Sequence, residues 1–99
     1  MAVKVERQLV AEELQKLNHW TLQGDQIERV FTFGTFVDSM IFVNKVAEIA
    51  EEEEHHPDIR IIYNRVTLAL TTHDAGGLTL KDFQMARRID SLLDDGQKQ

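Results

Sequence analysis

Three of the four histidines in this chain fall in two short segments that could carry proton chemistry. His55 and His56 stand side by side before Pro57, and His73 follows in a later segment rich in threonine and glycine. Histidine is the side chain whose unperturbed pKa lies near neutrality, so an imidazole can donate or accept a proton at physiological pH. We therefore expect these three histidines to form a general acid–base site that the rest of the chain positions.

The surroundings of the histidine pair allow a functional and a structural interpretation. Glu51 lies four residues before His55, so a continuing helix would place both side chains on one face. A carboxylate beside an imidazole can orient the ring and favour its charged form. Cationic imidazoles are also favoured at a helix C-terminus, so the pair could simply cap a helix beside four glutamates. Spacing alone leaves both interpretations open.

Glu51 and the three histidines could in principle bind zinc. The spacing does not match a mechanism-bearing motif such as H-E-x-x-H, and adjacent histidines before a proline form a poor chelate. The chain has no cysteine, which excludes thiolate ligands and nucleophiles. We expect neither a metal nor another cofactor.

Length and composition indicate one soluble domain over residues 1–99. Its 42% hydrophobic and 28% charged residues are ordinary values, and no stretch is apolar enough to span a membrane. The first residues lack the apolar core of a signal peptide. A net charge of -6 argues against direct nucleic-acid binding. Together with the missing cysteine, these features predict a cytoplasmic protein.

Hydrophobic periodicity predicts three helices and two strand pairs. The Gly24-Asp25 and Asn64-Arg65 dipeptides read as hairpin turns. Thr79 and Asp82 form an N-terminal capping box, with aspartate in place of the usual glutamate or glutamine. The order α-β-β-α-β-β-α favours an α+β fold with an antiparallel sheet. The expected elements are a helix over 6–17, strands over 19–22 and 27–33, a helix over 36–54, strands over 59–63 and 66–71, and a final helix after Thr79.

The helix over 36–54 carries more apolar surface than one contact with a sheet requires. Exposed apolar surface of this extent usually marks an interface, and a short chain gains core by associating. We therefore expect a homodimer or homotetramer. The final helix is a second candidate contact through Met85, Ile89 and Leu92.

The ordered pattern from residue 51 to residue 82 resembles the signature of the pterin-4a-carbinolamine dehydratases, in a form typical of microbial members. The resemblance extends from about Leu14 to the last helix, and Trp20 and the phenylalanine-rich strand before the long helix also match. The residues that carry the signature are Glu51-x-x-x-His55-His56-Pro57, Tyr63-Asn64-x-Val66 and Leu70-x-Thr72-His73-x-x-x-Gly77-Leu78-Thr79-x-x-Asp82.

The resemblance implies a four-stranded antiparallel sheet with three helices on one face, and a dimer or tetramer. It implies catalytic roles for His55, His56 and His73. Lys81 stands where some animal members have arginine, so a bidentate contact there is not expected. The implied substrate-binding residues are Glu51, Trp20, Pro57, Thr72, Asp74 and Lys81.

The implied reaction removes water from a 4a-hydroxytetrahydropterin and gives a quinonoid dihydropterin, as in tetrahydrobiopterin recycling. Histidines acting as acid and base need no metal or cofactor for this step. We expect His55 and His73 to transfer protons and His56 mainly to bind the pterin. A pterin-dependent hydroxylase is the expected pathway partner. The alternative is a non-catalytic role as a dimerisation partner of a transcription factor or as an enzyme-assembly factor.

Overall fold

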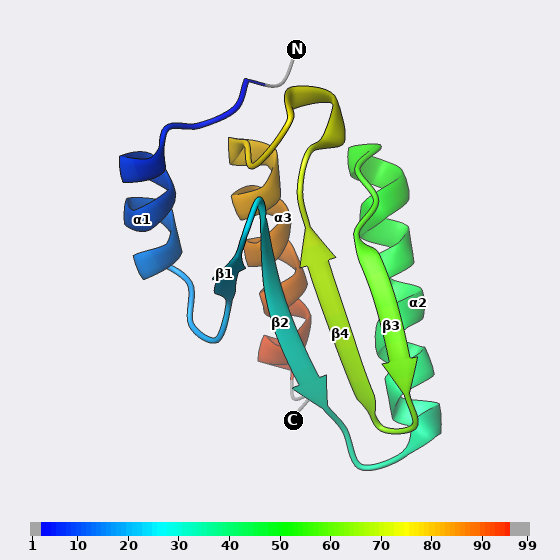
Figure 1. Cartoon of the computed structure of the whole chain (residues 1–99). Coiled ribbons are helices and arrows are strands. Elements are labelled where there is room, and N and C mark those ends of the chain that lie inside the picture. Colours follow the sequence, from blue (N-terminus) through cyan, green and yellow to red (C-terminus); the bar gives the residue numbers. More distant parts are fainter. Residues whose placement is uncertain (1–2, 96–99) are drawn as a thin grey trace.

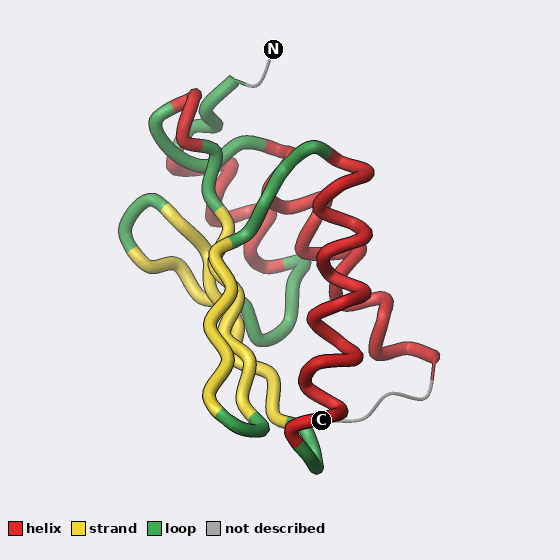
Figure 2. Tube along the Cα trace, turned by 90° about the vertical axis from the view of Figure 1, so that its right-hand side faces the viewer, coloured by secondary structure: helices red, strands yellow, loops and turns green. Residues whose placement is uncertain are grey.

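The computed structural model describes residues 3–95 as an antiparallel sheet with helices packed on one of its faces. Figure 1 shows the elements in chain order, and Figure 2 shows the helices on one side of the sheet. The α+β fold and the order α-β-β-α-β-β-α are therefore confirmed. The elements are α1 (Arg7–Gln15), β1 (Thr21–Gln23), β2 (Gln26–Thr32), α2 (Phe36–Glu53), β3 (Asp58–Ile62), β4 (Arg65–Leu70), the 3-10 turn η1 (His73–Ala75), α3 (Leu80–Ser91) and the 3-10 turn η2 (Leu92–Asp95).

The four strands follow the order β1-β2-β4-β3, with every neighbouring pair antiparallel. Ile27 pairs with Leu70 in the centre of the sheet, and Asp58 pairs with Ala69 at the start of the edge strand β3. Because side chains alternate across a strand, Leu68 and Leu70 face the helices and Ala69 points to the open face. None of the helices within residues 3–95 is long and apolar enough to cross a membrane.

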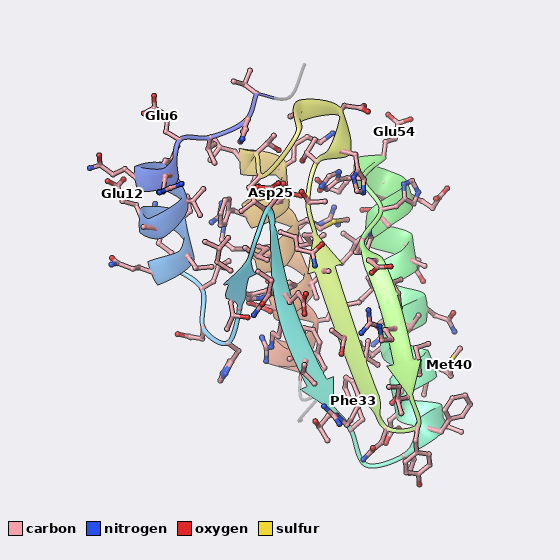
Figure 3. All side chains as sticks on the ribbon, viewed as in Figure 1. Glu6, Glu12, Asp25, Phe33, Met40 and Glu54 are labelled. Atoms are coloured by element: carbon pink, nitrogen blue, oxygen red, sulfur yellow. The ribbon has the colours of Figure 1, made fainter. Side chains whose placement is uncertain are left out.

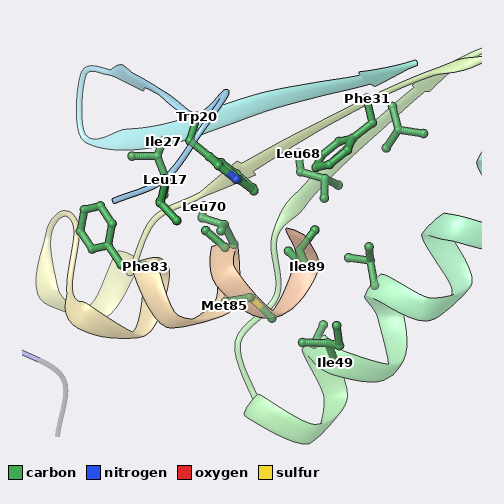
Figure 4. Packing of buried hydrophobic residues seen from close by; sticks show 14 of the residues in the cluster. Leu17, Trp20, Ile27, Phe31, Ile49, Leu68, Leu70, Phe83, Met85 and Ile89 are labelled. Carbon is green, nitrogen blue, oxygen red and sulfur yellow. The ribbon is translucent and has the colours of Figure 1, made fainter. Parts of the chain in front are cut away.

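The core lies between the sheet and helices α2 and α3 (Figure 4). Phe31 of β2 packs against Phe42 of α2, with ring centroids 4.7 Å apart. Arg29 shares the buried face of β2, where its guanidinium lies 4.4 Å from the centre of the Phe31 ring and pairs with Asp90 of α3 at 2.7 Å. This ion pair explains how a charged residue fits an otherwise apolar strand face.

The second hairpin turn lies at a different position from the one that the sequence predicted. The second hairpin turns at Tyr63 and Asn64, one residue earlier than expected, so the predicted Asn64-Arg65 turn is wrong. The Asn64 side chain donates to the Phe33 carbonyl at 2.9 Å, and Phe33 N–H donates to the Asn64 carbonyl at 2.8 Å. These bonds tie the turn to the end of β2 and fix its position.

The start of α3 agrees with the predicted capping box. The Asp82 carboxylate accepts the Thr79 N–H at 2.9 Å, and the Thr79 side chain accepts a hydrogen bond in the first turn. Met85 and Ile89 are fully buried within the chain, so this part of α3 is not the exposed contact surface we expected.

Candidate active site

Helix α2 ends in a turn that sends the two adjacent histidines in different directions. Glu54 adopts a left-handed conformation with φ 50° and ψ 43°. The His55 N–H donates to the Ala50 carbonyl at 3.1 Å, and the Glu54 N–H donates to the Glu51 carbonyl at 3.4 Å. This pair of bonds is a Schellman motif. It turns His55 inward, where 9% of the residue is exposed, and leaves His56 on the surface.

His55 is held by a buried carboxylate on α3. Its Nε2 lies 2.6 Å from Oδ1 of Asp82, which is fully buried. Oδ2 of Asp82 accepts the Thr72 hydroxyl at 2.8 Å and the Thr79 backbone N–H at 2.9 Å. A buried carboxylate needs such donors to offset its lost hydration.

Glu51 pairs with His56 rather than with His55, the partner that helical spacing predicted. The His56 Nε2 lies 2.7 Å from Glu51 Oε2, and both side chains are well exposed. The left-handed residue Glu54 breaks the helical periodicity before His55, so the expected four-residue spacing no longer holds. A pair this exposed orients the ring of His56 more than it stabilises the fold.

His73 lies at the start of η1, on a short loop that closes on itself. Thr72 and Gly77 exchange backbone hydrogen bonds at 3.1 and 3.3 Å. Gly76 has a φ of 77°, a conformation that glycine adopts without steric cost. The loop therefore presents the His73 side chain to solvent on a short, hydrogen-bonded turn just beyond β4.

His56 and His73 line one pocket at the end of the sheet. The pocket has a volume of about 410 Å³. A second pocket of about 370 Å³ adjoins it and shares His73, Gln26 and Thr71. Figure 3 shows Glu54 and Asp25 toward this end of the molecule. The full lining of the first pocket is Gln26, His56, Pro57, Asp58, Ala69, Thr71 and His73.

Two larger hollows, of about 840 and 830 Å³, lie beside the N-terminal segment. Neither is lined by a histidine. We assign the candidate active site to the smaller pocket because it holds the groups that can transfer protons.

The other predicted site residues are divided between the pocket and other regions. Pro57 lines the pocket beside His56, and Asp74 is exposed on η1 next to His73. Thr72 is buried and directs its hydroxyl to Asp82. Lys81 lines one of the larger hollows beside the N-terminal segment.

Trp20 lies in the core and not in the pocket. It is 4% exposed, and its Nε1 donates to both carboxylate oxygens of Asp90 at 3.0 Å. Burial raises the pKa of Asp90, although the hydrogen bonds from Trp20 and the charge of Arg29 act in the opposite direction. Within one chain, the hydrogen bonds from Trp20 to Asp90 link the start of β1 to α3.

Five residues of the site, Ala69 among them, were not assigned to it from the sequence. Gln26, Asp58 and Thr71 line the pocket because strand pairing brings them together, and no local motif marks them. Asp82 was expected as a helix cap and as the last residue of the family signature, but it was given no role in the site; its place in that signature was the signal that could have led to it. Within residues 3–95, no three His, Asp or Glu side chains gather as a metal-binding group; metal-free chemistry remains an expectation.

Comparison with known proteins places this geometry in a family. The family model described as pterin 4 alpha carbinolamine dehydratase matches residues 3–92. A protein of Acidobacterium capsulatum, provisionally named a pterin-4-alpha-carbinolamine dehydratase, is 60% identical over 84 residues, which are 85% of this chain and 91% of the relative. A relative from Sulfurisphaera tokodaii with the same provisional name is 47% identical over 91% of this chain and 97% of its own length.

Two known structures share the fold. A transcriptional coactivator/pterin dehydratase from Brucella melitensis has a TM-score of 0.86 at 33% identity, covering 90% of this chain and 97% of the other. A pterin dehydratase-like protein described as a RuBisCO assembly factor in the alpha-carboxysome has a TM-score of 0.65 at 26% identity, covering 76% of this chain and 89% of the other. The match of the family model over nearly the whole chain, with relatives this similar, shows that the chain belongs to the pterin 4 alpha carbinolamine dehydratase family.

Proposed function

We propose that this protein removes water from 4a-hydroxytetrahydropterins and gives quinonoid dihydropterins, by histidine general acid–base catalysis. One observation carries the proposal: imidazoles from the end of α2 and from the loop after β4 line a single pocket. The family membership supports the choice of a pterin as substrate.

The reaction requires an acid and a base near the same ring. The C4a–O bond breaks, and the departing hydroxyl takes a proton to leave as water. N5 loses its proton, and the electrons of that N–H bond form the N5=C4a double bond. Protons gained and lost balance, so two imidazoles of suitable protonation can complete the cycle.

We assign proton transfer to His55 and His73, and binding of the pterin mainly to His56. The Glu51 carboxylate orients His56 at the mouth of the pocket. His73 lines the pocket, whereas His55 is not among its lining residues and is buried against Asp82, next to His56 in the chain. Gln26 and Thr71 add polar groups that could meet the amide edge of a pterin.

A dehydration assay tests this proposal. The 4a-hydroxytetrahydropterin is generated freshly, and formation of the quinonoid dihydropterin is followed by absorbance with and without the protein. We expect acceleration well above the spontaneous rate and saturation with substrate. A rate equal to that of the spontaneous reaction would exclude the activity.

The second candidate function is an interaction role, as a dimerisation partner or an assembly factor. Its specific support is the apolar surface on α2, where Phe36, Val37 and Ile41 are 47%, 63% and 44% exposed. The two structural relatives are named a transcriptional coactivator/pterin dehydratase and a RuBisCO assembly factor, so the names of those proteins include an interaction role. The presence of all three histidines favours catalysis, and the two roles can coexist.

The oligomeric state, the pathway partner and the cellular location of the protein are also proposals. We expect a homodimer or homotetramer, because the same apolar side chains of α2 are left uncovered within one chain. A pterin-dependent hydroxylase that supplies the substrate is the proposed pathway partner, in tetrahydrobiopterin recycling. A cytoplasmic location remains the expectation from composition.

A further inference from the structure

A second pocket adjoins the candidate active site and has His73 in common with it. Gln23 and Asp25 of the β1–β2 hairpin line this pocket, as do Gly76 and Gly77 of the loop after β4. Figure 3 labels Asp25 at the tip of the hairpin. Pockets for whole drug-sized ligands begin at about 300 Å³. The second pocket, with a volume of about 370 Å³, therefore has ample room for a short chemical group.

The lining of the second pocket is polar throughout. Besides two glycines, it consists of glutamine, aspartate, threonine and histidine. A Cβ built on Gly76 would meet nothing within 4 Å, so this wall is open and is formed by backbone. The first pocket differs, because Pro57 and Ala69 give it apolar surface. A flat ring therefore suits the first pocket, and a hydroxyl-bearing group suits the second.

The hairpin is fastened to the strand that precedes the His73 loop. The Thr71 hydroxyl donates to the backbone carbonyl of Asp25 at 2.6 Å, and β2 pairs with β4 directly beside this bond. Because this bond uses the backbone of Asp25, its carboxylate remains available. Within residues 3–95, no ion pair joins that carboxylate to a cation. The pocket thus has a fixed wall with an acceptor at its edge.

Gln23 and Asp25 offer complementary hydrogen-bonding groups. A carboxylate only accepts, whereas a side-chain amide has two hydrogens to donate and an oxygen that accepts. The Gln23 amide nitrogen donates to the Thr21 hydroxyl at 3.3 Å, which leaves its second hydrogen available. A ligand hydroxyl can donate to Asp25 or accept from Gln23, whereas a methyl group can do neither.

The connectivity of the pterin ring indicates which of its groups would face this pocket. The bonds that change in dehydration lie at C4a and N5. The C4 carbonyl of the amide edge is bonded to C4a, and C6 is bonded to N5, so these groups lie on opposite sides of the C4a–N5 bond. His73, a proposed proton-transfer residue, lines both pockets. With the C4a–N5 bond beside His73 and the amide edge in the first pocket, the substituent on C6 points to the second.

From this arrangement we propose that the second pocket is a specificity subsite for a hydroxyl-bearing substituent on C6 of the substrate, with Gln23 and Asp25 as its hydrogen-bonding residues. The inference rests on the proposed dehydration for the placement of the ring. Both side chains are exposed to solvent, so the gain should be that of a hydrogen bond made in exchange for water. The two residues should determine which pterin binds and leave the proton transfers unchanged.

The first experiment compares two stable probes by isothermal titration calorimetry with the wild-type protein. The probes are 7,8-dihydrobiopterin, which carries a dihydroxypropyl group on C6, and 6-methyl-7,8-dihydropterin. Neither has a 4a-hydroxyl to lose, so the comparison requires no turnover. We expect the dihydroxypropyl probe to bind about 3- to 10-fold more tightly, the size of one net hydrogen bond. Equal affinity for the two probes would overturn the proposal, even if every variant failed to fold.

Variants then test whether the preference comes from the hairpin. Asp25→Ala keeps the backbone carbonyl that Thr71 contacts, and Gln23→Ala keeps the backbone pairing of β1. Each should weaken binding of the dihydroxypropyl probe about 3- to 10-fold and change that of the methyl probe less than about twofold. Glu12→Ala is the control, because Glu12 is an exposed carboxylate on α1 that lines neither pocket. Equal weakening of both probes in both hairpin variants would contradict the assignment.

Dehydration kinetics separate this inference from the proposed function. The hairpin variants should raise KM for the dihydroxypropyl substrate and leave kcat nearly unchanged, because they remove binding that the ground state and the transition state share. A wild type that shows the expected probe preference without accelerating dehydration would exclude the proposed function and retain the subsite. A wild type that accelerates dehydration but shows no preference between the two substituents would exclude the subsite alone. Binding of neither probe would exclude both.

Discussion

The three histidines differ in how much of each imidazole a ligand can reach. His73 is exposed on η1, and His56 is exposed beside Glu51, but His55 is buried against Asp82. An exposed ring can adjust to a substrate, whereas a buried ring is fixed before the substrate arrives. Of the three imidazoles, one is thus held in place within the fold and two face solvent.

Removing either proton-transfer imidazole should slow the reaction without unfolding the protein. We expect His55→Ala and His73→Ala each to lower kcat by about 10²-fold or more, the usual size of a general acid–base effect. His19→Ala is the matched control, because His19 is an exposed histidine outside the pocket. Steady-state kinetics and circular dichroism give the two measurements. Turnover like that of the wild type in the His55→Ala/His73→Ala double variant would refute the assignment.

The carboxylate of Glu13 makes the free energy of unfolding fall as the solution becomes acidic. It is buried between Lys16 at 3.0 Å and Arg87 at 3.2 Å, and the hydrogen bond from Lys16 is the main cause that lowers its pKa from the ordinary value of 4.5. Because the pKa of Glu13 is lower in the folded state than in the unfolded state, its carboxylate stabilises the fold at pH values above the unfolded-state pKa. This contribution is lost as the pH falls through the folded-state pKa.

Glu13→Gln should therefore be less stable than the wild type at pH 7. The difference should shrink as the pH falls below 4.5, the range in which the wild type loses the contribution of the carboxylate. Urea unfolding across this range measures both values. Glu12→Gln is the control, because Glu12 is exposed and its carboxylate meets the Gln8 amide at 3.5 Å rather than a cation. A constant difference at every pH would show that the charge of Glu13 contributes nothing.

At the scale of elements, the end of α2 stores backbone strain next to the site. Glu54 adopts a left-handed conformation, which costs a residue with a Cβ roughly 1–2 kcal/mol relative to a right-handed one. Glycine adopts it freely, and it is the usual residue at this position of a Schellman motif. This chain has glutamate at that position, so the turn that sends His55 and His56 in different directions costs conformational free energy.

Glu54→Gly should raise the free energy of unfolding by about 0.5–1 kcal/mol, after allowing for the greater entropy of glycine in the unfolded chain. Glu48→Gly, an exposed position inside α2, should lower it by about 1 kcal/mol. Denaturant unfolding of the two variants and the wild type provides the comparison. Destabilisation of similar size in both would contradict the left-handed turn.

The helices and strands could be predicted from hydrophobic periodicity, but one turn could not. The Thr79–Asp82 capping box gave the start of α3 because its chemistry is local. The Tyr63-Asn64 turn was missed because tertiary bonds from Asn64 to Phe33 decide it. Tyr63 consequently takes a φ of 51°, which no local propensity of tyrosine would suggest.

In the candidate site too, residue types could be predicted from the sequence, but contacts between distant segments could not. The histidines were predicted from residue type, and the pocket brings His56 and His73 together. The partner of each ring was not predicted, since Glu51 was expected beside His55, and Asp82 was expected as a cap and a signature residue without a contact to a histidine. Pairing between segments distant in the sequence depends on the register of the whole fold, which spacing along the chain does not contain.

At the scale of the whole molecule, the pocket and the apolar surface lie at opposite ends of α2. The histidines follow its last residue, whereas Phe36, Val37 and Ile41 belong to its first turns. Ile62 and Tyr63, on the β3–β4 turn, are also exposed, at 63% and 64%. This turn and the start of α2 lie at the same end of the molecule (Figure 1), and Figure 3 labels Met40 in the same region. An association through this end would leave the pocket open.

Self-association through the start of α2 should therefore be separable from catalysis. We expect the wild type to be a dimer or tetramer in light scattering, with a mass at least about twice the 11.4 kDa of one chain. Ile41→Asp places a charge where a second copy would bury an apolar side chain, so it should shift the protein toward monomer while dehydration persists. Leu80→Asp is the matched control, because Leu80 is 46% exposed on a helix, close to the 44% of Ile41, and lies at the start of α3. A wild-type protein that stays monomeric at micromolar concentration would refute the prediction, and equal dissociation in both variants would place the contact elsewhere.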